Sequence, residues 1–177
     1  MKEIRLHGRG GQGIVTSAEV IVYAASEAGL FAACFPYFGF EKKGGPVAAF
    51  VRIDDRKIRE KCQIYEPDCV LIVDPTLVTP QATVFDGLKN EGVVVMNCAD
   101  PKAYSFPKNA AQIGVVDANA ISQEIMGRIL PNTVMLGAFA KITGWVDKDR
   151  LAGRTAEIWG EKNSQAVLAG YEQAHLL

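Results

Sequence analysis

Gly8-Arg9-Gly10-Gly11-Gln12-Gly13 is the stretch that decides the fold, because four of its six residues are glycine. Alternating apolar residues over 4–7 predict a strand before it, and an apolar helix is predicted after it over residues 12–28. The segment therefore lies where a first strand turns into a first helix, with the spacing G-x-G-x-x-G. Glycines let the backbone approach an anion, and a helix N-terminus presents N–H groups to phosphate. Close strand–helix packing is the alternative interpretation of the same glycines.

The composition indicates one domain over residues 1–177. Hydrophobic residues make up 49% of the chain and charged residues 22%, which allows a full core and argues against disorder. With 19 basic and 20 acidic residues the net charge is −1, so we expect no nucleic-acid partner.

The cysteines indicate neither a metal site nor an iron–sulfur site, because no two of them form a C-x-x-C pair. They are Cys34, Cys62, Cys69 and Cys98. Buried thiols in a reducing cytoplasm are the favoured interpretation, and a disulfide between Cys62 and Cys69 stays open. The N-terminus lacks the apolar region of a signal peptide, and no apolar run reaches the length of a membrane span. We therefore expect a cytoplasmic protein with no membrane partner.

Strands and helices alternate along the predicted chain. Strands are expected at 4–7, 32–37, 47–53, 69–73, 92–97 and 113–116, with a possible short return at 56–59. Helices are expected at 12–28, 118–129, 133–143, 147–159 and 161–174, and residues 79–89 form a modest helix or a loop. This alternation predicts an α/β fold, a three-layer sandwich with a mostly parallel, Rossmann-like sheet.

Ligands of such sheets bind beyond the carboxyl ends of the strands. Three elements are predicted at or beside those ends: the turn at 8–13, the loop at 41–45, and the turn Asp74-Pro75. A dinucleotide site needs an acidic residue after the second strand, and residues 34–38 contain none. Instead Lys42 and Lys43 precede Gly44 and Gly45, which suits phosphate oxygens. A solvated lysine loop is the alternative.

Few residues suggest catalysis by this chain. His7 and His175 are the only histidines, and His7, just before the glycine turn, is interpreted as a hydrogen-bonded structural residue that could touch a ligand. No H-E-x-x-H, G-x-S-x-G or P-loop pattern occurs. We therefore expect no catalytic residue and no metal ligand here.

Four longer blocks resemble a known family in their order and spacing. They are His7 to Gly13, Phe35 to Ile53, Gln63 to Asp68, and Asn132 to Ala138, the last reading N-T-x-M-L-G-A. Together they resemble the γ subunit of 2-oxoacid:ferredoxin oxidoreductases, most closely the pyruvate type, over nearly the whole chain.

The resemblance implies a division of labour. Such complexes decarboxylate a 2-oxoacid on thiamine diphosphate and Mg, reduce ferredoxin or another acceptor through [4Fe-4S] clusters, and form an acyl-CoA. The α and β subunits hold thiamine diphosphate, and β and a ferredoxin-like δ subunit hold the clusters. The γ chain is implied to border the coenzyme A site, through its turn at 8–13 and its loop at 42–45.

Other functions stay open. The oxoacid could be branched-chain or aromatic instead of pyruvate. The chain could be a free-standing nucleotide-binding enzyme, although the missing acid argues against it. It could also be a purely structural subunit in which Lys42 and Lys43 touch a partner.

Overall fold

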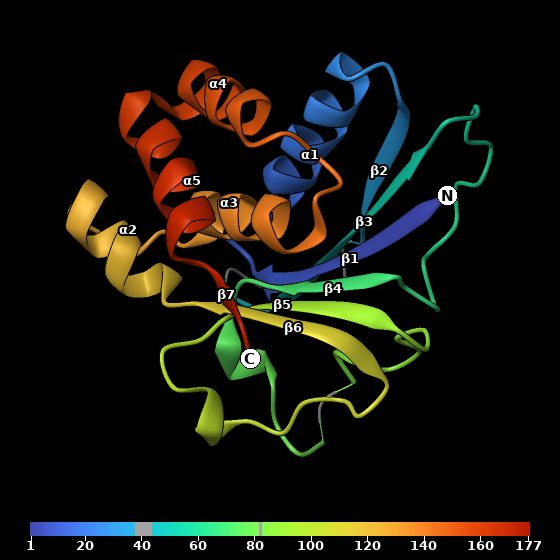
Figure 1. The fold of residues 1–177 in the computed structure, drawn as a ribbon, viewed down its shortest axis with the longest axis horizontal. Helices are drawn as coiled ribbons and strands as arrows, with labels where there is room; N and C mark the ends of the chain where they lie inside the picture. The colour runs from blue at the N-terminus through green and yellow to red at the C-terminus, as the bar shows by residue number, and fades with distance from the viewer. Residues whose placement is uncertain (38–43, 82) are drawn as a thin grey trace.

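Residues 1–37, 44–81 and 83–177 are described by the computed structural model, and within them the strands form one sheet in the order β2-β3-β1-β4-β5-β6-β7 (Figure 1). The strands are β1 Lys2–Arg9, β2 Phe31–Tyr37, β3 Pro46–Asp54, β4 Cys69–Ile72, β5 Gly92–Asn97, β6 Ala110–Val116 and β7 His175–Leu176. The helices are α1 Ile14–Glu27, α2 Ala118–Met126, α3 Asn132–Thr143, α4 Lys148–Trp159 and α5 Glu161–Gln173. Two short 3-10 turns are η1 Pro75–Leu77 and η2 Pro101–Ala103.

The centre of the sheet is parallel, as expected, since β1 pairs with β4, β4 with β5, and β5 with β6 in parallel. The flanks are antiparallel, because β3 runs against both β1 and β2 and β7 runs against β6. The connection between β2 and β3 is too short for the crossover that parallel neighbours require. Consecutive strands joined this way pair antiparallel, and of the two it is β3 that also pairs with β1.

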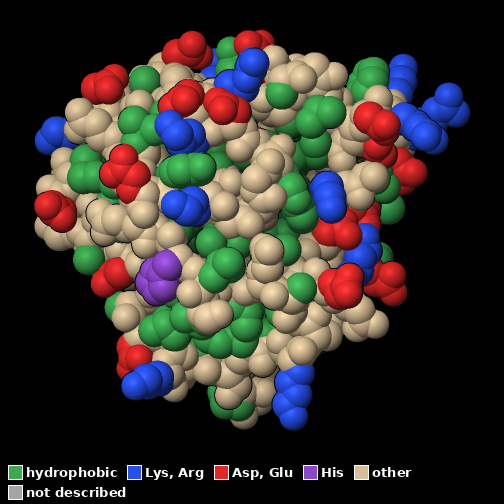
Figure 2. All heavy atoms as spheres, viewed as in Figure 1, with side chains coloured by type: hydrophobic (Ala, Val, Ile, Leu, Met, Phe, Trp, Pro, Cys, Tyr) green, Lys and Arg blue, Asp and Glu red, His purple; other side chains and the backbone are tan. Residues whose placement is uncertain are grey.

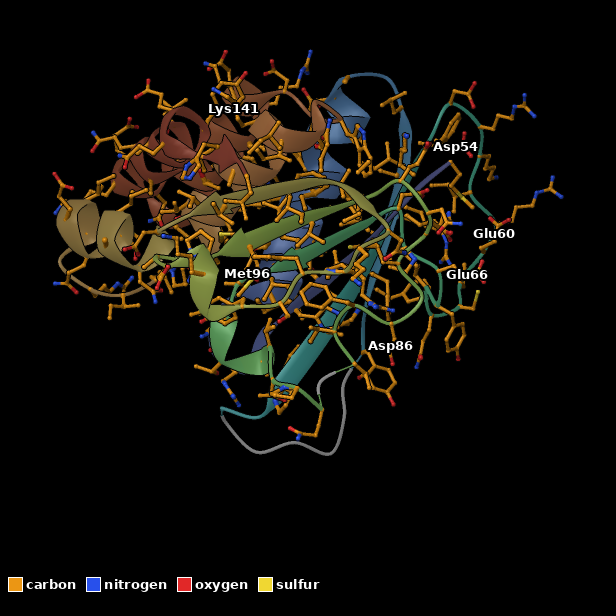
Figure 3. All side chains as sticks on the ribbon, turned by 60° about the horizontal axis from the view of Figure 1, so that its bottom comes forward. Asp54, Glu60, Glu66, Asp86, Met96 and Lys141 are labelled. Atoms are coloured by element: carbon orange, nitrogen blue, oxygen red, sulfur yellow. The ribbon has the colours of Figure 1, made fainter. Side chains whose placement is uncertain are left out.

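The sheet is covered differently on its two faces, which gives the three layers (Figure 1). The helices lie on one face and enclose the larger core, which includes Ile4, Leu6, Leu71 and Phe139. The other face is covered by the connections after β4 and β5, with η1 and η2 in them, around a smaller core. Figure 3, turned toward this loop layer, shows Met96 of β5 and Asp86 of a connection on this side.

Local signals explain most element ends. The helix expected at 118–129 ends at Met126, because Gly127 adopts a left-handed conformation with φ 71° and caps it. Gly144, with φ 65°, ends α3 as predicted. The return strand considered for 56–59 is absent from the described residues, and turns occupy the described part of 79–89.

Two glycines allow a close contact between helices α3 and α5. A Cβ on Gly137 would collide with the carbonyl oxygen of Val167, and one on Gly170 would collide with that of Val134. The two backbones therefore touch without intervening side chains. This packing buries every residue from Asn132 to Ala140.

Two buried arginines connect the sheet to the loops before and after β4. Arg5 of β1 donates from Nη1 to the carbonyl of Ile64 at 3.4 Å and from Nη2 to that of Val84 at 3.0 Å. Arg52 of β3 donates from Nη1 to the carbonyl of Cys62 at 2.9 Å. A buried guanidinium needs such acceptors, and loop carbonyls need donors, so each satisfies the other.

The surface over the helices is mixed in charge, whereas hydrophobic side chains gather near the C-terminus (Figure 2). Leu176 and Leu177 are more than half exposed there. Among the helices described, none combines the length and the apolar character needed to cross a bilayer.

Candidate functional site at the carboxyl ends of β1 and β4

The strand order changes direction between β1 and β4: strands β2 and β3 lie on one side of β1, and β4, β5 and β6 lie on the other. After β1 the chain passes through α1 to the β2-β3 side of the sheet, and after β3 it returns to add β4, β5 and β6 on the other side. The carboxyl ends of β1 and β4 lie together, since His7 is in register with Ile72. In open α/β sheets, such a switch point is where ligands bind. The glycine turn lies there.

Each glycine of the turn has its own role. A Cβ on Gly8 would collide with the side chain of Ile14, which supports the packing interpretation. Gly13 is the N-cap of α1 with φ 71°, and a Cβ on it would lie 2.7 Å from Asn132 Nδ2. Gly11 has φ 97° and no described atom within 4 Å of its Cβ position. In this one turn, Gly8 and Gly13 allow close packing with neighbouring side chains, whereas the backbone at Gly11 is open to a ligand.

The start of α1 has the features of an anion site. No side-chain hydrogen bond caps the helix among the described residues, and Gly11, in front of it, is exposed. Uncapped N–H groups and the positive end of the helix dipole favour negative charge.

A hydrogen-bond network joins the turn to the end of β4. Arg9 Nε lies 3.4 Å from Asp74 Oδ2, and its Nη2 donates to Thr76 Oγ1 at 2.8 Å. Gln12 Nε2 donates to Asp74 Oδ2 at 2.6 Å, while Gln12 Oε1 accepts from the Arg9 N–H at 2.8 Å. Thr76 N–H donates to Asp74 Oδ1 at 2.9 Å. Asp74 therefore fixes both the turn and the first residues of η1.

The carboxylate of Asp74 stays ionised in this setting. Its burial acts to raise the pKa, but hydrogen bonds from Thr76 and Gln12 and the charge of Arg9 outweigh burial and leave the pKa below its ordinary value. Asp74 is thus a fixed negative charge that holds Arg9 in place.

The predicted site residues divide into three groups. Gly8, Gly10, Gly11, Gln12 and Gly13 lie together at the switch point, with Gln12 engaged at both ends of its side chain. Gly44 joins them, since its carbonyl accepts from Arg9 Nη1 at 3.2 Å, and the Gly45 carbonyl accepts from the Gly10 N–H at 2.9 Å. Lys42 and Lys43 lie outside the described residues.

Sequence analysis missed Arg9, Thr76 and Asn132. Arg9 stands inside the quoted turn, but the sequence analysis assigns it no role. Asn132 is buried beside Gly13, with Nδ2 3.5 Å from Ser17 Oγ, and its Oδ1 has no described partner. In the sequence, Asn132 is marked only by its place in the block N-T-x-M-L-G-A. No local sequence pattern predicts that it lies beside the glycine turn.

His7 has the structural role that was favoured. Its Nε2 accepts a hydrogen bond from Arg5 Nε at 3.0 Å. Burial, together with the charge of Arg5, lowers the pKa of His7 to about 3, so the ring is neutral at physiological pH. Over residues 1–37, 44–81 and 83–177, no three His, Cys, Asp or Glu side chains gather as a metal site would require, and all four cysteines are free.

The model of the pyruvate ferredoxin/flavodoxin oxidoreductase family matches residues 3–173. The chain belongs to this family. It is 46% identical to pyruvate synthase subunit PorC of Methanothermobacter thermautotrophicus, covering 100% of this chain and 98% of the relative. It is 42% identical to the common γ subunit of the pyruvate/ketoisovalerate oxidoreductases of Pyrococcus furiosus, covering 99% of this chain and 98% of the relative. The crystal structure of pyruvate oxidoreductase subunit PORC from Thermotoga maritima has a TM-score of 0.85 at 33% identity, covering 99% of this chain and 97% of that one.

The chain is thus a γ subunit of the pyruvate/2-oxoacid:ferredoxin oxidoreductases, as its four sequence blocks indicated. The fold also explains why residues 34–38 lack the acid of a dinucleotide site. In this family member β3, not β2, is the neighbour of β1 on that side, so the end of β2 is separated from the glycine turn by a strand.

Proposed function

We propose that this γ subunit contributes to coenzyme A binding in a complex that oxidatively decarboxylates a 2-oxoacid and reduces ferredoxin. The observation that carries the proposal is the uncapped start of α1 at the switch point, behind the open backbone of Gly11. Such a helix start suits the pyrophosphate of coenzyme A, because its N–H groups and dipole favour anions. In this proposal Lys42 and Lys43, which precede Gly44 in the sequence, supply further positive charge.

The chemistry of the reaction belongs to partner subunits in this proposal. Thiamine diphosphate, Mg and [4Fe-4S] clusters are held by α, β and δ chains, and this chain adds no redox group of its own. The whole complex acts in the cytoplasm. Pyruvate is the leading substrate, since relatives include pyruvate synthase subunits.

A branched-chain 2-oxoacid is the second candidate substrate. The P. furiosus relative is named as common to pyruvate and ketoisovalerate oxidoreductases, so one γ chain there belongs to two activities. We therefore propose that the oxoacid is selected by other subunits. Co-purification of the native complex, followed by assays with pyruvate, a branched-chain and an aromatic 2-oxoacid, identifies the substrate.

The outer edge of the sheet is proposed as a partner surface. β2 is an edge strand, with Phe31 and Tyr37 about half exposed. Phe35 packs edge-to-face on Phe50, with ring centroids 6.3 Å apart, and is only partly covered. Exposed aromatic residues of this kind are enriched at interfaces. The neighbouring Phe38 and Phe40 lie outside the described residues.

Single Lys42→Ala and Lys43→Ala variants of the assembled complex test coenzyme A binding. A charge-assisted contact is typically worth about 1.5–3 kcal/mol, on the order of ten- to hundredfold in affinity. At least one variant is expected to raise the KM for coenzyme A while leaving the KM for the oxoacid nearly unchanged. Charge reversal to Glu should have a larger effect, which added salt should reduce. Wild-type coenzyme A kinetics in both assembled alanine variants would instead favour a structural or interface loop.

A further inference from the structure

The guanidinium of Arg9 is held at the switch point by residues of two segments, the turn after β4 and the residues just before β3. Thr76 Oγ1 accepts from Nε at 3.1 Å and from Nη2 at 2.8 Å, and the Gly44 carbonyl accepts from Nη1 at 3.2 Å. Asp74, itself nearly buried, lies behind Nε. The inner edge of the guanidinium is therefore fixed by protein groups, which limits the entropy lost when its other edge binds a ligand.

The outer edge of Arg9 has donors to spare. Of the five N–H groups of a guanidinium, three are engaged as described, so that one on each terminal nitrogen has no acceptor among the described residues. The side chain is 34% exposed. Two neighbouring N–H groups of one guanidinium match two oxygens of a phosphate in a bidentate contact. This pattern fits a phosphate monoester better than an uncharged group.

A cavity of about 370 Å³ is lined in part by residues that closely follow Thr76, the partner of Arg9. Val78 is only two residues beyond Thr76, so their Cα atoms are at most about 7 Å apart. The lining comes from the connections after β4 and β5: Val78, Thr79, Pro80, Ala103, Tyr104 and Ser105. Its size falls within the range of small-ligand pockets, roughly 300–1,000 Å³. Pro80 and the ring of Tyr104 offer flat apolar surfaces, and Thr79 and Ser105 offer hydroxyls for the polar edge of a base.

Three features can be matched with successive groups of coenzyme A. They are the open start of α1, the spare donors of Arg9, and the cavity whose lining begins two residues after Thr76. In coenzyme A the pyrophosphate is joined to a ribose that bears the 3′-phosphate, and the ribose carries adenine. We infer that Arg9 binds the 3′-phosphate of coenzyme A and that the cavity beside Thr76 receives its adenine. This inference rests on the proposed function and assigns the nucleotide half of the same ligand.

Steady-state kinetics of the assembled complex with coenzyme A and with 3′-dephospho-coenzyme A test the assignment. Arg9→Gln is expected to raise the KM for coenzyme A about ten- to hundredfold and to leave the KM for the dephospho form nearly unchanged. Arg154→Gln is the matched control, because Arg154 is 36% exposed and paired with Glu157, far along the chain on α4. It should change neither constant.

A second variant tests the cavity. Ala103→Trp fills the space between the two connections and is expected to raise the KM for both coenzymes, without affecting the KM for the oxoacid. Adenosine 3′,5′-bisphosphate should compete with coenzyme A in the wild type, more weakly in Arg9→Gln, and most weakly in the double variant.

The outcomes separate this inference from the proposed function. An equal rise in KM for coenzyme A and its dephospho form in Arg9→Gln overturns the 3′-phosphate assignment, because the arginine would then act on a shared group or on the fold. Unchanged constants in both Arg9→Gln and Ala103→Trp overturn the whole subsite. If Lys42→Ala or Lys43→Ala still raises the KM for coenzyme A in that case, the proposed function stands without it.

Discussion

Arg5 Nε donates a hydrogen bond to His7 Nε2 at 3.0 Å, two residues along the same face of β1. The contact requires a neutral imidazole, since a protonated ring has no acceptor. It also brings a permanent positive charge next to the ring. Burial is the main cause, and with the charge of Arg5 it lowers the pKa of His7 to about 3.

Acid should therefore destabilise the chain through His7. In the unfolded state the histidine titrates near its ordinary pKa of 6.5, so on acidification the unfolded state takes up the proton first. The stabilising contribution is complete above about pH 6.5 and is lost progressively as the pH falls toward the folded pKa. At about pH 5, the unfolding free energy lost through His7 amounts to about 2 kcal/mol.

We expect His7→Gln to lessen this loss of unfolding free energy between about pH 7 and pH 5. Denaturant unfolding of the purified chain at several pH values measures it, with His175→Gln as the exposed control. An identical pH dependence in His7→Gln and the wild type would contradict the role of His7.

Gly13→Ala should destabilise the start of α1 more than Gly11→Ala does. Both positions have positive φ, which strains any residue with a Cβ by about 1 kcal/mol or more. Only at Gly13 would the new methyl also press on Asn132 Nδ2, 2.7 Å away. Chemical denaturation of the two variants gives the comparison. Equal losses would mean that Asn132 moves aside without cost.

Gly137→Ala should be among the most destabilising small substitutions in this chain. The added methyl meets the carbonyl of Val167 and the Tyr171 N–H, so α3 and α5 must separate, at a cost of about 3 kcal/mol. Gly153→Ala is the same chemical change in an open part of helix α4, where we expect a gain of roughly 0.5–1 kcal/mol. Thermal and denaturant unfolding measure the stability of both variants. If the two substitutions changed the unfolding free energy in the same direction, the prediction would be contradicted.

The isolated chain should bind neither iron nor thiamine diphosphate. Its four cysteines are scattered singly, Cys69 and Cys98 are buried, and burial raises the pKa of both thiols, which disfavours the thiolate that a cluster needs. Iron analysis and an absorption spectrum of the pure protein check this. A stoichiometric brown chromophore in the recombinant chain would refute it.

The sequence by itself determined the alternation of strands and helices and the place of the glycine turn between the first two. These follow from local properties: apolar periodicity, the freedom of glycine at positive φ, and the unbroken apolar runs of buried strands such as 92–97. The family was indicated separately, by the resemblance of four sequence blocks to those of a known family in the same order and spacing.

Only the tertiary structure decided which segments meet. The insertion of β3 beside β1 depends on pairing between distant strands. The cover of one sheet face by loops depends in part on the carbonyl of Val84, which accepts from Arg5 although it lies 79 residues away. Gln12 was predicted from the sequence to bind a ligand, but its side-chain amide donates to Asp74, 62 residues away. Arg9 is a candidate ligand residue because Thr76 and Gly44 hold its guanidinium in place. Side-chain partners of this kind are fixed by the spatial order of strands, and no local pattern encodes that order.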